Sequence, residues 1–279
     1  MRAYIIQPHY SMDDSELDDC ISKELDLMDL CDDSADIIVL PEYSDVLTVT
    51  ETEEDFIRAL ERYSLIIAEK AQQTAKRCHA IVFANYGCKT EKGYRNTTHV
   101  FDRQGNEVGR YYKQHPAPSE IKNEGIDTDY ANEKQEVYAV DVEGIRFCFR
   151  TCYDFYFYED LIEIARKKPD IIIGCSYQRT DTHQALEIMS RFLSYNTNAY
   201  LLRSSISLGE DSAVCGCSMA VAPDGTVLAN MKNRVGIETV EFDVKKKYFK
   251  QSGFNGTPQA HYEYVDAGRK GVNPLDRKF

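Results

Sequence analysis

The sequence has no long apolar segment. Its longest uninterrupted apolar runs, such as Ala80–Ala84, span about five residues, whereas a membrane-spanning helix needs about 20. At the N-terminus only Ala3–Ile6 is apolar, which is shorter than the core of a secretory signal peptide. Hydrophobic residues still make up 43% of the 279 residues, enough for a full core. We therefore expect a folded, cytoplasmic protein.

Basic residues are scarce relative to acidic ones. The chain has 33 Lys and Arg against 46 Asp and Glu, which gives a formal net charge of −13. A surface of this sign repels nucleic-acid phosphates and anionic lipid headgroups. We therefore expect neither nucleic acid nor a membrane surface as the main partner, and a small-molecule substrate instead.

Metal-binding cysteine motifs are also missing. The nine cysteines include no C-x-x-C pair, and their odd number argues against a complete disulfide framework. The closest pairs, Cys148/Cys152 and Cys215/Cys217, have no histidine at zinc-ligand spacing. We expect free thiols and no metal site.

The chain shows no internal repeat, no low-complexity tract and no linker long enough to divide it. This predicts a single domain over residues 1–279. The tail, residues 249–279, is rich in glycine, asparagine and charge, which predicts an extended C-terminal arm.

Strand-like and helix-like segments alternate along the chain. Short apolar runs predict buried strands at 36–40, 79–85, 145–150 and 170–175. Amphipathic periodicity predicts helices at 17–28, 50–71, 161–167 and 182–196, the second opened by a capping box from Thr50 to Glu53. Segments 95–101 and 107–112 flank a glycine-containing turn and predict a hairpin. The pattern indicates an α/β fold with a mixed sheet, and leaves open whether there is one sheet or two.

Three predicted strand ends carry reactive side chains. Glu42 follows an apolar strand and Pro41, so a partly desolvated carboxylate there could act as a general base. Lys113 ends the hairpin and could present an ammonium to an oxyanion. Cys152 follows a third strand and could be a nucleophile. Taken alone, each residue is better explained without a catalytic role, Glu42 as a solvated carboxylate, Lys113 as a surface lysine and Cys152 as one more buried cysteine.

Together these segments resemble the nitrilase (carbon–nitrogen hydrolase) superfamily over essentially the whole chain. The LPE, YYK and CYD segments occur in the family's order. Longer stretches are similar too, namely YRNTTHVFDRQGNEVGRYYKQH, CYDFYFYED, SRFLSYNTNAYLL and CSMAVAPDGTVLA. The resemblance implies a four-layer α-β-β-α sandwich and a homodimer or higher homo-oligomer.

The resemblance also implies roles for particular residues. Cys152 would be the nucleophile, Glu42 the general base and Lys113 the electrostatic stabiliser, with no metal or organic cofactor required. Many family members add a second glutamate after the lysine. Glu120 and Glu124 are the candidates here, and we favour Glu120, seven residues after Lys113.

The chain departs from the family motif CYDxRFPE. Tyr156 stands at the arginine position, where some relatives bind a substrate carboxylate. Arg179 could take over that role, or it could be a surface arginine in an ion pair. Tyr153, Tyr156 and Tyr177 give the region an aromatic character suited to an apolar or cationic amide.

CYD in place of the CWE of true nitrilases favours the amidase branches of the family. The leading hypothesis is therefore a thiol-dependent hydrolase of a small linear amide or N-carbamoyl compound. Two alternatives stay open, a nitrilase acting on R–C≡N and a catalytically idle member that serves as a binding subunit.

Overall fold

The computed structural model describes residues 1–122, 125–132, 136–251 and 253–267. Twelve strands form two six-stranded sheets. In spatial order the first contains β12 (Gly236–Glu241), β1 (Arg2–Gln7), β2 (Ile37–Val39), β3 (Ile81–Thr90), β4 (Gly93–Phe101) and β5 (Glu107–Tyr112). The second contains β11 (Val227–Asn230), β10 (Met219–Val221), β9 (Tyr200–Ser204), β8 (Ile171–Cys175), β7 (Ile145–Thr151) and β6 (Ala139–Val142).

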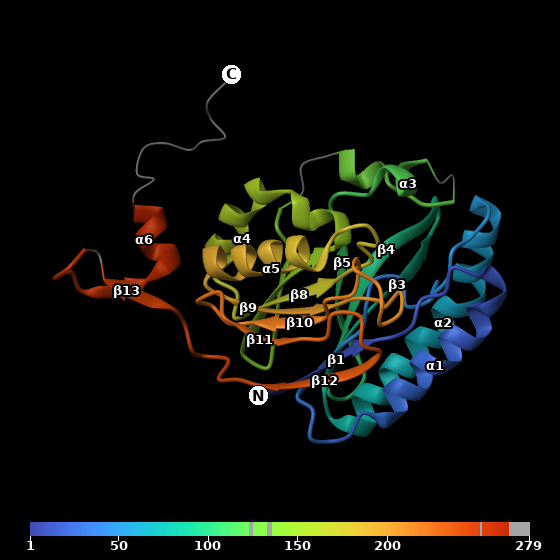
Figure 1. Ribbon diagram of the computed structural model, residues 1–279, viewed down its shortest axis with the longest axis horizontal. Helices are drawn as coiled ribbons and strands as arrows, with labels where there is room; N and C mark the ends of the chain where they lie inside the picture. The colour runs from blue at the N-terminus through green and yellow to red at the C-terminus, as the bar shows by residue number, and fades with distance from the viewer. Residues whose placement is uncertain (123–124, 133–135, 252, 268–279) are drawn as a thin grey trace.

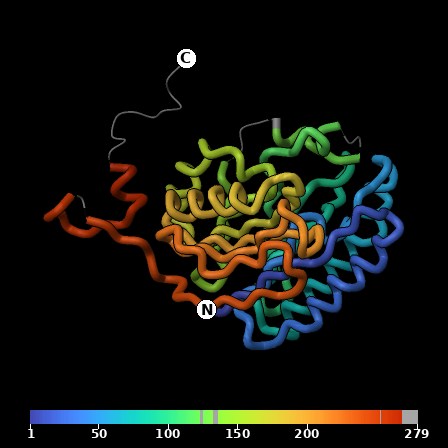
Figure 2. The backbone as a smooth tube through the Cα atoms, in the orientation of Figure 1, coloured from blue at the N-terminus to red at the C-terminus, as the bar shows by residue number. Residues whose placement is uncertain are grey.

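Both sheets are mixed. The central strands β1, β2 and β3 run parallel, as do β7, β8 and β9, and the outer strands add antiparallel pairs. The first and last strands of the chain's main body lie side by side, because β1 pairs with β12 across more than two hundred residues (Figure 2).

Alternation of side chains along the strands separates two kinds of core. In β2, Ile37 and Val39 point into the core between the sheets, whereas Ile38 points to the helices. Strands buried on both faces read as continuous apolar runs, which explains the DIIVL segment. The inter-sheet core joins both sheets, with Phe83 of the first packed against Phe147 of the second at 4.9 Å between ring centroids.

Helices cover both outer faces (Figure 1). The first sheet is covered by α1 (Leu17–Leu30) and α2 (Glu53–Cys78), through residues such as Met28 and Ile67. The second is covered by α4 (Leu161–Lys167) and α5 (His183–Thr197), through residues such as Ile164 and Leu193. The layers are therefore α-β-β-α, which confirms the predicted sandwich and answers the question of one sheet or two. No helix in the described ranges has an apolar stretch long enough to cross a bilayer.

The N-cap of helix α2 lies two residues later than predicted. Its N-cap is Thr52, whose Oγ1 accepts the backbone N–H of Asp55 at 3.1 Å. Thr50 and Glu53 have the same spacing as Thr52 and Asp55, so the sequence offers two overlapping capping patterns. The second is used, and both threonines line the same cavity.

Strand β3 is longer than predicted, and it forms a tight hairpin with β4 through the pair Thr90 and Gly93. The sequence did not predict the strand beyond Asn85, because the segment that follows lacks an apolar run. Gly93 has φ +127°, and a Cβ there would lie 2.5 Å from the Gly125 carbonyl oxygen, so the turn requires glycine.

The tail, for which the sequence predicts an extended arm, contains regular structure as far as it is described. Strands β13 (Phe249–Gln251) and β14 (Pro258–Ala260) form a two-stranded ribbon followed by α6 (His261–Ala267). Figure 1 shows this unit beside the helical layer of the second sheet. His261 packs on Tyr195 of α5 at 4.2 Å between ring centroids.

The inter-sheet core generates a stability prediction. Phe83 is fully buried and contacts two further rings, so Phe83→Ala should lower the free energy of unfolding by about 3–5 kcal/mol. Urea denaturation measures the loss. Leu30→Ala, at a side chain that is 70% exposed, is the control and should change it by less than about 0.5 kcal/mol. Equal losses in both variants would contradict this packing.

Candidate active site

The Glu42 carboxylate lies at the end of β2, where Pro41 stops the strand. The following turn is held by Asn85, whose side-chain oxygen accepts the Tyr43 backbone N–H at 2.8 Å and whose carbonyl accepts that of Ser44 at 2.9 Å. Tyr43 has φ +49°, a strained conformation for a tyrosine. The turn therefore fixes Glu42, which is only 1% exposed, in one orientation.

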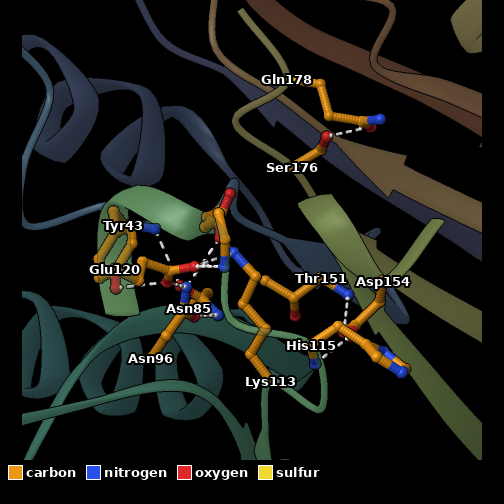
Figure 3. Close-up of polar contacts among 12 residues, drawn as sticks. Tyr43, Asn85, Asn96, Lys113, His115, Glu120, Thr151, Asp154, Ser176 and Gln178 are labelled. Carbon is orange, nitrogen blue, oxygen red and sulfur yellow. Dashed lines mark hydrogen bonds and ion pairs between the residues drawn. The ribbon is translucent and has the colours of Figure 1, made fainter. Parts of the chain in front are cut away.

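The Lys113 ammonium joins two carboxylates. Lys113 directly follows β5 and is 2% exposed. Its Nζ donates to Glu42 Oε1 at 2.8 Å and to Glu120 Oε2 at 2.6 Å (Figure 3). Glu120 lies in the short helix α3 (Pro118–Ile121), and its Oε2 also accepts the Ala117 backbone N–H at 2.6 Å. The three side chains form one buried ion cluster.

Two asparagines that the sequence analysis did not single out support this cluster. Asn96 Nδ2 donates to Glu42 Oε1 at 2.7 Å and to Glu120 Oε1 at 2.8 Å. Asn85 Nδ2 in turn donates to Asn96 Oδ1 at 2.9 Å, so the two amides form a relay (Figure 3). Asparagine is depleted in strands. The presence of asparagine in the predicted strand 79–85 and in the predicted hairpin segment 95–101 could therefore have indicated a functional role for these two residues.

Glu42 and Glu120 differ in whether a carboxylate oxygen remains without a hydrogen bond. Both Glu120 oxygens are occupied, since Oε1 also accepts the Tyr43 hydroxyl at 2.8 Å. Glu42 Oε2, by contrast, is buried and has no hydrogen-bond partner in the described part of the chain. Only Glu42 therefore has an oxygen available to receive a proton.

Cys152 begins a single 3₁₀ turn (Cys152–Tyr156) directly after β7. Its φ is +46°, so the backbone is strained at the residue that carries the thiol. Burial raises the pKa of this thiol well above its ordinary value, Glu42 raises it further, and Lys113 acts in the opposite direction. At neutral pH the sulfur is protonated, and ionisation requires an adjacent base.

Burial and neighbouring charges have opposing effects on the pKa values of Glu42 and Lys113. Burial raises the pKa of Glu42, Lys113 lowers it, and Glu120 raises it again, so the net pKa lies above the ordinary value. Burial alone would lower the pKa of Lys113, but Glu120 and Glu42 outweigh burial and raise it. Lys113 thus stays cationic, and the Glu42 carboxylate is suited to exchange protons.

Asp154 joins the cysteine turn to the lysine segment (Figure 3). One of its oxygens accepts the Thr151 backbone N–H at 2.9 Å and the Tyr111 hydroxyl at 2.7 Å. The other accepts the His115 backbone N–H at 2.8 Å and His115 Nδ1 at 2.9 Å. Thr151 directly precedes Cys152, and His115 is two residues after Lys113. The Asp154 carboxylate therefore fixes the distance between the turn that carries Cys152 and the segment that carries Lys113.

The ion cluster and the Cys152 thiol line a cavity of about 740 Å³. Every residue for which the sequence predicted a role in catalysis or substrate binding lines it, namely Glu42, Lys113, Glu120, Cys152, Tyr153, Tyr156, Tyr177 and Arg179. Glu124, the alternative second glutamate, lies outside the described residues. The walls also include Tyr10, Tyr43 and Phe56, which make the cavity strongly aromatic.

Arg179 is a cation in the wall of this cavity. Its guanidinium lies over the Tyr177 ring at 5.0 Å and over the Tyr10 ring at 5.4 Å, and it donates to the Tyr10 hydroxyl at 2.6 Å. Within the described ranges it forms no ion pair with a carboxylate. Of the two interpretations that the sequence left open, the surface ion pair is therefore not the one observed.

Comparison with known proteins agrees with this geometry. The family model for carbon–nitrogen hydrolases matches residues 14–249. A search of curated proteins found no match.

Among solved structures, the fold is similar to the NitN amidase from Nesterenkonia sp. AN1, with a TM-score of 0.69 at 15% identity over 98% of this chain and all of that one. It is also similar to Saccharomyces cerevisiae Nit3, a member of branch 10 of the nitrilase superfamily, with a TM-score of 0.66 at 18% identity over 100% of this chain and 96% of that one. The C. elegans NitFhit protein gives a TM-score of 0.67 at 17% identity over 99% of this chain and 64% of that one.

At such identities the structural likeness concerns the fold, and the family model carries the assignment. The chain belongs to the carbon–nitrogen hydrolase family.

Proposed function

We propose that the protein is a thiol-dependent hydrolase that cleaves a non-peptide C–N bond in a small linear amide or N-carbamoyl compound. One observation carries the proposal. The Lys113 ammonium is held within 2.8 Å of both Glu42 and Glu120, at the base of a cavity that Cys152 also lines. A binding subunit would have no need of a buried ion cluster beside a cysteine at a strained turn.

In the first step the thiol attacks the substrate carbonyl carbon. Glu42 takes the Cys152 proton on Oε2, the oxygen without a partner, as the C–S bond forms. Negative charge then develops on the carbonyl oxygen. Lys113 and the backbone N–H of Tyr153 stabilise it, because both donors are fixed before the reaction begins.

The tetrahedral species then collapses. Glu42 returns its proton to the nitrogen, the C–N bond breaks, and ammonia or an amine leaves a thioester on Cys152. Water next attacks the thioester with Glu42 again accepting a proton, and the returning proton regenerates the thiol as the acid departs. Atoms and charges balance with no other reactant than water.

The two carboxylates have different tasks in this proposal. Glu120 acts as a positioning residue, because all its hydrogen-bonding capacity holds Lys113, Tyr43, Asn96 and the Ala117 N–H. Glu42 exchanges protons. Lys113 contributes a permanent positive charge, since its raised pKa prevents it from acting as an acid near neutral pH.

The cavity wall supports a substrate with a negative group. Arg179 has no carboxylate partner in the described part of the chain, and its exposed guanidinium in the cavity wall can form charge-assisted hydrogen bonds with an anion. A cavity of about 740 Å³ suits a small linear molecule. In place of the apolar or cationic amide expected from the aromatic residues alone, we therefore propose an amide or carbamoyl compound that bears a carboxylate remote from the scissile bond.

The nucleophile is tested by Cys152→Ala. Because the thioester cannot form, ammonia release from a panel of amides and carbamoyl compounds should fall by at least about 10³-fold. Circular dichroism should show an unchanged fold. Cys78→Ala, at a buried cysteine at the end of α2, is the matched control and should retain most activity. Full turnover by Cys152→Ala would refute the assignment, and nitrile consumption without any amide activity would favour a nitrilase.

The carboxylate preference is tested by Arg179→Met. We expect KM for a carboxylate-bearing amide to rise about tenfold or more, since a hydrogen-bonded charge pair contributes roughly 1.5–3 kcal/mol. The neutral analogue of the same length should keep its kcat/KM within about threefold. Steady-state kinetics on the two compounds gives the answer. An equal loss on both would show that Arg179 acts on the shape of the cavity and not on substrate charge.

The link between the two segments is tested by Asp154→Asn. An amide cannot accept all four hydrogen bonds, so the Cys152 turn and the lysine segment should lose their fixed separation. We expect kcat to fall about 10–100-fold while KM stays within about threefold. Asp141→Asn, at a surface ion pair with Arg146, is the matched control. A kcat of Asp154→Asn within twofold of wild type would show that Asp154 is not needed to hold the Cys152 turn and the lysine segment in place.

A further inference from the structure

Three side chains that can bind a metal converge behind the wall of the active cavity. His9 follows β1, Glu16 ends the 3₁₀ helix η1 (Asp14–Glu16), and Cys20 lies on the first turn of α1. One ligating atom from each lies within 4.8 Å of the other two. We propose, contrary to the expectation from cysteine spacing, that His9, Glu16 and Cys20 bind a borderline-soft divalent metal ion of the Zn²⁺ class.

The donor set suits this class of ion. Imidazole nitrogen, carboxylate oxygen and thiolate sulfur are the three protein ligands of zinc, whereas Mg²⁺ and Ca²⁺ take oxygen ligands. Zinc bonds of about 2.0–2.3 Å in a tetrahedron place neighbouring donor atoms roughly 3.3–3.8 Å apart. All three donor atoms lie within 4.8 Å of one another, so the longest separation closes by roughly an ångström, and Glu16 is an exposed side chain that can move. Its exposure also leaves the fourth position to water.

The donors are not engaged elsewhere. In the described ranges, neither the His9 ring nor the Glu16 carboxylate makes a side-chain hydrogen bond or an ion pair. The Cys20 side chain is buried, at 1% exposed. Helical spacing of four residues puts Glu16 and Cys20 on the same side of the turn. The three groups are thus free to bind one ion.

The surrounding charge favours a cation. Glu16 and Asp19 lie close to Cys20 in the chain, and the Lys23 ammonium is paired with Asp19 at 2.5 Å. The net charge of this group is therefore negative. Binding an ion there releases the thiol proton to solvent and forms the metal–sulfur bond in its place.

The site is coupled to the cavity by short covalent and hydrogen-bonded connections. Tyr10, the residue after His9, lines the cavity and accepts the Arg179 hydrogen bond. Ser11 donates to the Leu47 carbonyl at 3.1 Å and accepts from the Val49 N–H at 3.1 Å. A bound ion would therefore fix the strand end that forms one wall of the active cavity. The binding itself does not depend on the proposed catalytic function.

The test uses Co²⁺ as a spectroscopic probe of the full chain carrying Cys152→Ala, which removes the competing thiol of the active cavity. We expect one equivalent of Co²⁺ to bind, with thiolate-to-cobalt charge-transfer absorption and the visible bands of a tetrahedral ion. Zn²⁺ should displace it and raise Tm. Adding Cys20→Ser should abolish the charge-transfer band, and adding His9→Gln should weaken binding at least about tenfold.

Two matched variants serve as controls. Cys78→Ser changes another buried cysteine, and His79→Gln another histidine, and both should bind Co²⁺ as the parent does. If Cys20→Ser fails to fold, His9→Gln gives the same answer from a partly exposed position. The proposal is overturned if the parent shows no charge-transfer band, or if the band persists in Cys20→Ser or His9→Gln with undiminished affinity.

Discussion

The burial of one ammonium between two carboxylates is the interaction on which the rest of the site depends. Lys113, Glu42 and Glu120 are each less than a tenth exposed, and removing such charges from water costs several kcal/mol per ion. That cost is offset by the close geometry and by hydrogen bonds to every carboxylate oxygen of the pair except Glu42 Oε2. The Asn96 amide and the Tyr43 hydroxyl supply those contacts, which makes the cluster a preorganised electrostatic environment.

The two-sheet sandwich is what allows this cluster to meet a thiol. Glu42 and Lys113 follow strands of the first sheet, whereas Cys152 follows β7 of the second. Packing of the sheets through the Phe83 and Phe147 core brings those strand ends together. Asp154 then fixes the two segments locally with hydrogen bonds to both. Strain at Cys152 is maintained because the surrounding core and this carboxylate leave the turn no alternative.

The sandwich fold and the three reactive side chains could be predicted from the sequence. Hydrophobic periodicity indicates which segments are buried, and the order of the LPE, YYK and CYD segments indicates the family. Periodicity could not place Asn85 and Asn96, whose role depends on partners from other strands. It could not choose between Thr50 and Thr52, since both match the same capping pattern. Nor could it find the regular structure in the tail, where composition is polar. The homodimer and the cytoplasmic location stay predictions.

The central step of the proposed mechanism is transfer of the Cys152 proton to Glu42 Oε2, the carboxylate oxygen that has no hydrogen-bond partner in the described part of the chain. The acylation rate in a single turnover of an amide substrate, measured for Glu42→Gln by quenched-flow mass spectrometry of the thioester, tests this directly. Glu24→Gln is the control, because Glu24 is equally buried and the pKa of its carboxyl is raised well above its usual range by burial. The account predicts a loss of about 10²–10⁴-fold for Glu42→Gln and less than about threefold for Glu24→Gln. Acylation by Glu42→Gln at nearly the wild-type rate would contradict it.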